Sequence, residues 1–202
     1  MLLVIDTSTA ACTAALFDEA GACLASRSEI IGRGHAERLV PMIEELMAGR
    51  SAARILVGVG PGSFTGIRVG IAAAHGLAIG WNAGISGMSS LGLLAAGVGS
   101  GDEIIAAMNG GHGELFVQSF EGHSLMPTSE AMNLPPKAAA EAFRADAVVG
   151  PGARSLVDAR GSGTILDAWP SAENAVRLPE GLRSLPPKPL YGRAPDARAK
   201  AA

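Results

Sequence analysis

One run of residues has the types and spacing that could bind an anion: Gly60-Pro61-Gly62-Ser63-Phe64-Thr65-Gly66. An apolar, β-branched stretch at 55–59 precedes it and predicts a strand, and a predicted helix follows it. Glycines let the backbone turn sharply, and Ser63 or Thr65 can cap a helix whose first N–H groups favour anions. The run therefore predicts either a binding loop or a tight turn that serves packing alone.

Several common active-site signatures are missing from this run and its surroundings. A Walker-type loop needs a lysine after its last glycine, but the first lysine of the chain is Lys137. A dinucleotide fingerprint needs a carboxylate about 20 residues further on, and Gly80-Trp81-Asn82 supplies none. The chain also has no Gly-x-Ser-x-Gly elbow of a serine hydrolase.

The elements that must position this loop form a repeated pattern. In the first half, predicted strands at 2–5, 10–17 and 22–28 precede a helix at 35–47 in which Pro41 predicts a kink or a second start. Four further elements follow: the strand at 55–59, a helix at 65–79, a strand near Ile85, and a helix opened by Ser89 or Ser90. Predicted strands at 104–108, 114–120 and 147–149 then repeat the plan, and the last runs into a second Gly-Pro-Gly, at 150–152.

Two tandem βββαβα halves indicate an α/β protein with the actin-like ATPase fold, which sugar kinases and heat-shock-type chaperones share. We expect a first lobe at 1–100, a smaller, reduced second lobe at 101–189, and a tail at 190–202 that packs back on the first lobe. Cys12 and Cys23 flank a predicted hairpin turn that would leave them out of register, so we expect no disulfide.

Composition limits the classes of function. The net charge of -3 argues against a chain that holds nucleic acid alone. Charged residues make up 17% of the chain, against about 25% in typical domains, which indicates either a covered partner surface or a bias towards small residues. The N-terminus has no basic flank and no apolar run reaches the length of a membrane span, so we expect a cytoplasmic protein without a signal peptide.

Several stretches resemble the TsaB family: 3–9, 34–41, 60–70, 113–116 and 191–197. The resemblance implies a non-catalytic partner of a TsaD-like subunit, with a TsaE-like ATPase in the same complex. Such complexes make threonylcarbamoyladenosine at the tRNA adenosine next to the anticodon. A homodimer of the chain alone is compatible with the resemblance, as is weak or interfacial adenine nucleotide binding without a resident cofactor.

The resemblance also shows where catalytic residues are replaced. The TsaD pattern has a His-x-Glu-Gly-His metal motif where this chain reads Ser90-Leu91-Gly92-Leu93-Leu94, so we expect no metal site. The four histidines, at 35, 75, 112 and 123, are scattered. The first half keeps Asp6 at its turn, but the matching position of the second half is Asn109, so the carboxylate pair that would hold Mg²⁺ is lost. We expect Asp6 to cap its own turn through Thr7 and Ser8.

These observations predict two groups of site residues and no catalytic residue. A vestigial nucleotide-site loop comprises Asp6, Thr7, Ser8, Gly60, Gly62, Ser63 and Thr65. A partner-binding surface comprises His35, Glu37, Arg38, Pro41, Glu45, Gly66, Gly70 and Ala74. The last three form a small-residue stripe that faces either a partner helix or the chain's own sheet. An independent actin-fold ATPase or sugar kinase, a glycopeptidase-like enzyme, and a self-associating structural protein remain as alternatives.

Overall fold

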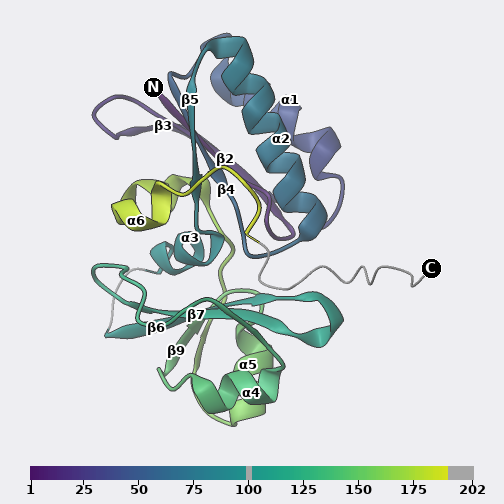
Figure 1. The fold of residues 1–202 in the computed structure, drawn as a ribbon, viewed down its shortest axis with the longest axis vertical. Helices are drawn as coiled ribbons and strands as arrows, with labels where there is room; N and C mark the ends of the chain where they lie inside the picture. The colour runs from purple at the N-terminus through teal and green to yellow at the C-terminus, as the bar shows by residue number, and fades with distance from the viewer. Residues whose placement is uncertain (99–101, 191–202) are drawn as a thin grey trace, which may run out of the picture.

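The computed structural model describes residues 1–98 and 102–190. It contains two lobes, each built on a five-stranded mixed sheet, with helices on the outer faces. Figure 1 shows the first lobe above, the second lobe below, and a short helix between them. The predicted α/β class and tandem-lobe architecture are confirmed.

The first lobe has the strand order β3-β2-β1-β4-β5. Its strands are β1 (Leu2–Asp6), β2 (Ala11–Phe17), β3 (Cys23–Ile30), β4 (Arg54–Gly58) and β5 (Gly84–Met88). Strand β1 pairs antiparallel with β2 and parallel with β4, so its C-terminal end lies at the centre of the sheet edge. Helices α1 (His35–Met47) and α2 (Phe64–Trp81) bury an apolar face against one side of the sheet.

The second lobe repeats this order as β10-β9-β6-β7-β8. Its strands are β6 (Glu103–Asn109), β7 (Leu115–Glu121), β8 (Met132–Leu134), β9 (Ala147–Val149) and β10 (Thr164–Leu166). Helices α4 (Pro136–Ala142) and α5 (Ala153–Arg160) cover its outer face. The predicted reduction of this lobe consists of shortened elements, since β8, β9 and β10 have three residues each and no strand of the plan is missing.

A shared apolar core joins the lobes. Helix α3 (Ser90–Ala96) is buried along its whole length between the two sheets. The 3-10 helix η2 (Ala172–Arg177) and helix α6 (Glu180–Arg183) then return to the first lobe, where η2 packs on β1, β2 and β3. The second lobe therefore ends at β10, earlier than the expected residue 189. Of the expected tail only Leu190 is described, and its N–H donates to the Val59 carbonyl; 191–202 lie outside the described residues.

Three local expectations can be compared with the structure. Helix α1 runs unbroken through Pro41, with no second start. The two cysteines are free, because Cys12 lies opposite Glu29 and Cys23 opposite Phe17 in the β2–β3 hairpin. Among the described residues, no helix combines the length and hydropathy needed to cross a bilayer.

Candidate functional site

The candidate site is the turn after β1, where Asp6 is fully buried. One Asp6 carboxylate oxygen, Oδ1, accepts hydrogen bonds from the Ser8 N–H (2.8 Å) and the Ser8 hydroxyl (2.7 Å). The other, Oδ2, accepts a hydrogen bond from the Ser90 hydroxyl at 2.7 Å. Asp6 therefore caps its own turn through Ser8, as expected. Thr7 takes no part in this cap, because its hydroxyl donates to the Gly66 carbonyl on α2.

The electrostatics of Asp6 follow from this burial. Loss of solvent raises the pKa of the Asp6 carboxyl above its ordinary value of 3.8, although the hydrogen bonds from Ser8 and Ser90 act in the opposite direction. Both carboxylate oxygens already have partners within the chain. Asp6 is thus an internal anchor that ties the first turn to α3.

The glycine loop packs directly on this turn. A Cβ added at Gly62 would lie 2.3 Å from the Ser8 carbonyl oxygen, and one at Gly66 would lie 2.0 Å from that of Thr7. The Ser63 N–H donates to the Ser8 carbonyl at 2.7 Å. Two chain segments approach so closely that only glycine fits between them. The packing alternative therefore accounts for the glycines of the loop.

The first turn of α2 shows which residue caps it. The Ser63 hydroxyl accepts a hydrogen bond from the Gly66 N–H at 3.2 Å, so Ser63 is the N-cap. Thr65, the other candidate, lies exposed on the first helical turn. Phe64 is also more than half exposed, and the Arg68 guanidinium stacks over its ring at 3.5 Å.

Helix α3 contacts the Gly-Pro-Gly loops of both lobes. At its start, the fully buried Ser90 donates its N–H to the Gly60 carbonyl, and its hydroxyl accepts a hydrogen bond from the Gly60 N–H. Near its end, Leu94 packs so closely on Gly150 that an added Cβ there would lie 2.3 Å from Leu94 Cδ2. From the sequence, Ser90 is a candidate helix start and stands in place of a metal ligand; the N-cap is in fact Ser89, whose hydroxyl accepts a hydrogen bond from the Gly92 N–H. The signal for the anchoring role of Ser90 is a serine that opens an otherwise apolar, small-residue helix.

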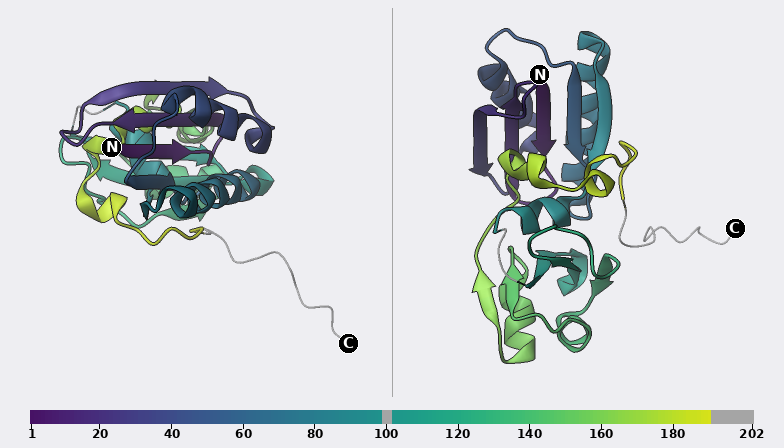
Figure 2. Two further views of the ribbon diagram at one scale, coloured as in Figure 1. Left: turned by 90° about the horizontal axis from the view of Figure 1, so that it is seen from above. Right: turned by 90° about the vertical axis from the view of Figure 1, so that its left-hand side faces the viewer.

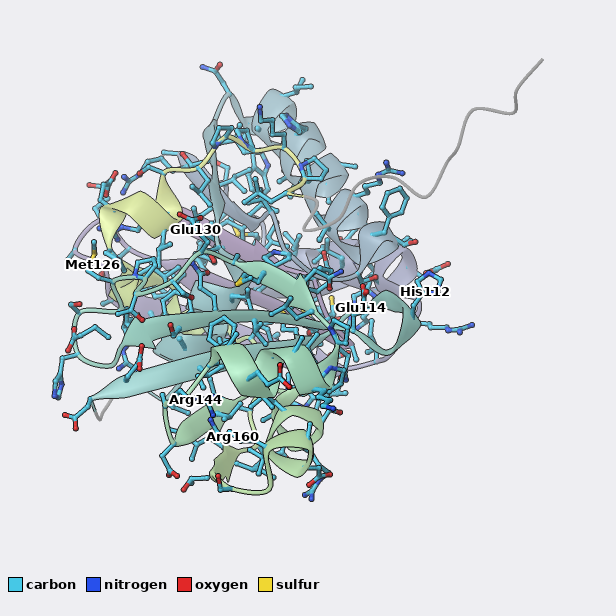
Figure 3. The ribbon with its side chains drawn as sticks, turned by 60° about the horizontal axis from the view of Figure 1, so that its bottom comes forward. His112, Glu114, Met126, Glu130, Arg144 and Arg160 are labelled. Atoms are coloured by element: carbon cyan, nitrogen blue, oxygen red, sulfur yellow. The ribbon has the colours of Figure 1, made fainter. Side chains whose placement is uncertain are left out.

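The matching turn of the second lobe is more open. Asn109 is exposed, and its amide donates to the Pro151 carbonyl at 3.2 Å. His112 and Glu114 follow on the same turn, and Figure 3 shows them at one end of the β6–β7 hairpin. Within 1–98 and 102–190, no three His, Cys, Asp or Glu side chains are grouped so that they could share a metal ion.

The predicted partner-binding residues of α1 divide into exposed and buried ones. Glu37, Pro41 and Glu45 are exposed. Arg38 is partly exposed and bridges Glu29 at 2.6 Å and Glu45 at 3.0 Å, and its hydrogen bonds lower the pKa of Glu29. His35, in contrast, is buried.

The prediction for His35 is therefore corrected. Its Nε2 lies 3.3 Å from the Ala11 carbonyl, so it joins α1 to β2 and takes no part in the surface. The small-residue stripe of α2 needs the same correction. Gly66, Gly70 and Ala74 are buried, and a Cβ at Gly70 would lie 2.5 Å from the Thr7 hydroxyl oxygen. The stripe therefore packs against the chain's own sheet and does not face a partner helix.

An apolar groove lies between α1 and α2, and the sequence analysis missed most of it. Its volume is about 340 Å³, and its lining residues are Val40, Ile43, Glu44, Met47, Gly49, Arg50, Leu77 and Trp81. Val40 is 55% exposed, and Ile79, also on α2, is 84% exposed. The available signal was apolar residues beside the buried faces of the helices, Val40 on α1 and Leu77 and Trp81 on α2.

The repeated lobes, the buried first turn and the helix between the sheets define an α/β protein of the actin-like ATPase fold. A family model described as "TsaD: tRNA N6-adenosine threonylcarbamoyltransferase" matches residues 27–135, more than half of the chain. The solved structure "YeaZ from Pseudomonas aeruginosa" is 31% identical, with a TM-score of 0.79 over 94% of this chain and 98% of that one. The chain belongs to the TsaB, or YeaZ-type, family of TsaD-related proteins.

Curated relatives agree with this assignment. The TsaB protein of Escherichia coli, a "tRNA threonylcarbamoyladenosine biosynthesis protein", is 34% identical over 128 residues, which cover 59% of this chain and 54% of that protein. The TsaB protein of Haemophilus influenzae is 33% identical over 57% of this chain and 51% of its own length. The chain thus spans about half the length of these relatives. An uncharacterized Mycobacterium bovis protein is 30% identical over 98% of this chain and 93% of its own length.

Proposed function

We propose that this protein is a non-catalytic, activating subunit that binds a TsaD-like enzyme. In that complex it supports the transfer of threonylcarbamoyl from its adenylate to the tRNA adenosine next to the anticodon. The observation that carries the proposal is the state of the first turn. Asp6 is buried with both oxygens occupied by Ser8 and Ser90, in a chain whose relatives are named for this pathway.

The residues favour a supporting role over an independent enzyme. ATP hydrolysis on this fold uses carboxylates at both turns to hold Mg²⁺ and orient water. Here the second turn has the amide of Asn109, bonded to Pro151. Ser90 and Leu94, which replace metal-ligand positions of the TsaD pattern, are both used in the core. These contacts favour the subunit over the ATPase, kinase and glycopeptidase alternatives.

The groove between α1 and α2 is the surface that we assign to the TsaD-like subunit. Val40 and Glu44 of α1, Arg50, and Leu77 and Trp81 of α2 are among its lining residues. The exposed predicted residues Glu37, Pro41 and Glu45 lie elsewhere on the surface of α1. An apolar helical face of the partner would cover the groove, while the rim charges would fix orientation.

A TsaE-like ATPase would join the same complex. With its net charge of -3, the isolated chain would not hold tRNA strongly. We propose no resident cofactor, because Asn109, Ser90 and Leu94 stand where the ligand residues would be.

Co-purification with a TsaD-like protein from the same cell tests the proposal. Val40→Glu places a charge in the groove and should weaken capture at least about tenfold, because an unpaired charge at the centre of an apolar interface is costly. Met126→Glu is the matched control. Its residue is 54% exposed, against 55% for Val40, and lies on the second lobe (Figure 3).

Two outcomes would contradict the proposed function. One is failure of the parent chain to capture the TsaD-like protein, whereas equal capture of Val40→Glu and Met126→Glu would contradict only the surface that we assign to it. The other is steady ATP turnover by the purified chain that Asp6→Ala abolishes, which would identify an independent enzyme.

A further inference from the structure

Residues 185–190 cross the first lobe beside β5, and we call this segment the strap. Figure 2, left, shows it in yellow after α6, along the side of the first lobe that lies opposite β3. Strand β5 is the outer strand of the sheet on that side. An outer strand presents unpaired backbone groups, which folded proteins often cover with another segment. The strap covers the edge of β5 in this way.

The two ends of the strap are bonded to the backbone of the first lobe. At one end, the Gly87 N–H of β5 donates to the Leu185 carbonyl at 2.7 Å, and the Leu185 N–H donates to the Gly87 carbonyl at 3.0 Å. At the other end, the Leu190 N–H donates to the Val59 carbonyl at 2.8 Å. Val59 immediately precedes the glycine loop. The strap therefore joins the outer strand to the start of that loop.

Close approach of the strap leaves no space for a side chain at two glycines. A Cβ added at Gly87 would lie 2.7 Å from the Pro186 carbonyl oxygen. One added at Gly60 would lie 3.1 Å from the Leu190 carbonyl oxygen. Glycine permits such an approach because it has no Cβ. The strap is thus fitted both to β5 and to the glycine loop.

The middle of the strap has few bonds that resist detachment. Pro186, Pro187 and Pro189 have no N–H, and the Lys188 N–H donates within the strap, to the Pro186 carbonyl. On α2, His75 Nε2 lies 3.3 Å from the Pro187 carbonyl, at an exposed position. Among the described residues, only the two ends of the strap therefore donate an N–H to the first lobe. Segments with so few bonds open at a lower cost than the core.

The glycine loop is supported by the strap on one side and by α3 on the other. The Gly60 N–H and carbonyl are both bonded to Ser90, at the start of α3. The neighbouring Val59 carbonyl accepts its bond from Leu190 of the strap. Detachment of the strap removes one of these two supports and leaves the other in place.

We propose that the strap is a latch. It opens as one unit while both lobes stay folded, and in its closed state it holds the glycine loop against the first turn. Three prolines among six residues restrict the backbone of the open strap, so its two ends attach and detach together.

The second lobe supplies an internal control. Its outer strand, β10, has no bridge to a further segment among the described residues. The Gly152 N–H of its Gly-Pro-Gly loop donates to the Ala107 carbonyl at 3.0 Å. A change confined to the strap should therefore leave the hydrogen exchange of the Gly152 amide unchanged.

Hydrogen exchange of the parent chain at low urea concentrations tests the opening. The Gly87, Leu185 and Leu190 amides should share one protection factor, at least about tenfold below that of the β1 amides at the centre of the sheet. It should depend little on urea, because detachment exposes little surface. Protection equal to that of β1 would mean that the strap opens only with the whole lobe, and unequal protection within the strap would mean that it has no single opening. Either result overturns the proposal.

A variant at the end of the strap tests its hold on the glycine loop. Leu190→Pro removes the N–H that bonds Val59 and should raise the exchange rate of the Ser63 amide, which donates to the Ser8 carbonyl, at least about tenfold. Leu190→Ala keeps the N–H and is the matched control. The Gly152 amide should exchange as in the parent chain. An unchanged Ser63 amide in a folded Leu190→Pro chain would show that the strap does not hold the loop.

Pro187→Ala gives a second test that removes no backbone bond. The open strap gains backbone freedom, so the Leu185 and Leu190 amides should both exchange about threefold faster, while Gly152 stays unchanged. If neither strap amide responds, or only one does, the latch is refuted even where Leu190→Pro fails to fold. None of these measurements uses the TsaD-like protein, so their failure leaves the proposed function standing.

Discussion

The two lobes share one order of elements, yet their first turns are held in different ways. After β1, Asp6 is buried and bonded to Ser8 and Ser90, and the glycine loop lies directly on the turn. After β6, Asn109 is exposed and its side-chain amide donates to the Pro151 carbonyl. Backbone topology alone therefore does not decide whether such a turn can receive a ligand.

Helix α3 shows the same difference along its own length. It contacts the Gly-Pro-Gly loop of the first lobe through the polar Ser90 and that of the second lobe through the apolar Leu94. The first lobe thus uses hydrogen bonds where the second uses packing. Polar networks specify geometry more narrowly than apolar contacts, because each buried group needs its partner.

The largest effect is expected from filling the contact between the glycine loop and the first turn. Gly66→Ala places a Cβ 2.0 Å from the Thr7 carbonyl and should lower the free energy of unfolding by about 3 kcal/mol, the upper end for overpacking. Gly152→Ala, whose Cβ meets its neighbours at 3.0 Å, should lower it by about 1 kcal/mol. Gly76→Ala, with open space around it, should raise it by about 0.5 kcal/mol. Urea unfolding measures all three, and equal losses at Gly66 and Gly152 would remove the distinction between the lobes.

The next effect concerns the polar anchor. Ser90→Ala leaves the Gly60 N–H without its hydroxyl acceptor and Asp6 Oδ2 without a donor, so we expect a loss of about 2 kcal/mol. Ser155→Ala is the control, since Ser155 lies exposed on α5, and it should change stability by less than about 0.5 kcal/mol. Thermal and urea unfolding report both changes. If Ser90→Ala leaves the free energy of unfolding unchanged, the hydrogen bonds of Ser90 contribute nothing measurable to stability.

A pH-dependent difference is expected from Asp6 itself. Because burial raises its pKa in the folded chain, the folded state holds the proton more tightly than the unfolded state. The contribution of Asp6 to stability is therefore complete below the unfolded pKa and decreases as pH rises through the folded one. Unfolding measured from about pH 4 to about pH 8 should show the parent chain losing stability relative to Asp6→Asn. The opposite slope would mean that the bonds from Ser8 and Ser90 outweigh burial.

Most of the fold could be predicted from the sequence, because apolar periodicity and the repeated Gly-Pro-Gly loops mark the elements of both lobes. The return of η2 to the first lobe could not. That segment, Ala172–Arg177, has neither strand nor long-helix periodicity, and its position depends on contacts such as the Ala172 N–H donating to Thr13, 159 residues away. Long-range contacts of this kind leave little trace in local pattern.

The candidate site was predicted less completely. Spacing correctly predicted the caps that Asp6 forms with Ser8 and that Ser63 forms with Gly66, since these partners lie two or three residues away. It could not decide the direction of the Gly66 stripe or the burial of His35. Both depend on how α1 and α2 are rotated against the sheet. A helix with small residues on one face and apolar residues on another has two candidate buried faces, and only the packed structure selects between them.

The smallest effect is expected at the second turn, where Asn109→Asp restores the carboxylate that the first lobe has. Asn109 is exposed and has one side-chain bond, at 3.2 Å, so the free energy of unfolding should change by less than about 0.5 kcal/mol. No pH-dependent loss should accompany it, because a solvated carboxylate titrates alike in the folded and unfolded chain. Urea unfolding of Asn109→Asp beside Asp6→Asn over the same pH range gives both quantities. A loss above about 1 kcal/mol would show that the Asn109–Pro151 contact fixes the second turn as firmly as Ser8 and Ser90 fix the first, since surface changes that break no such contact stay within about 0.5 kcal/mol.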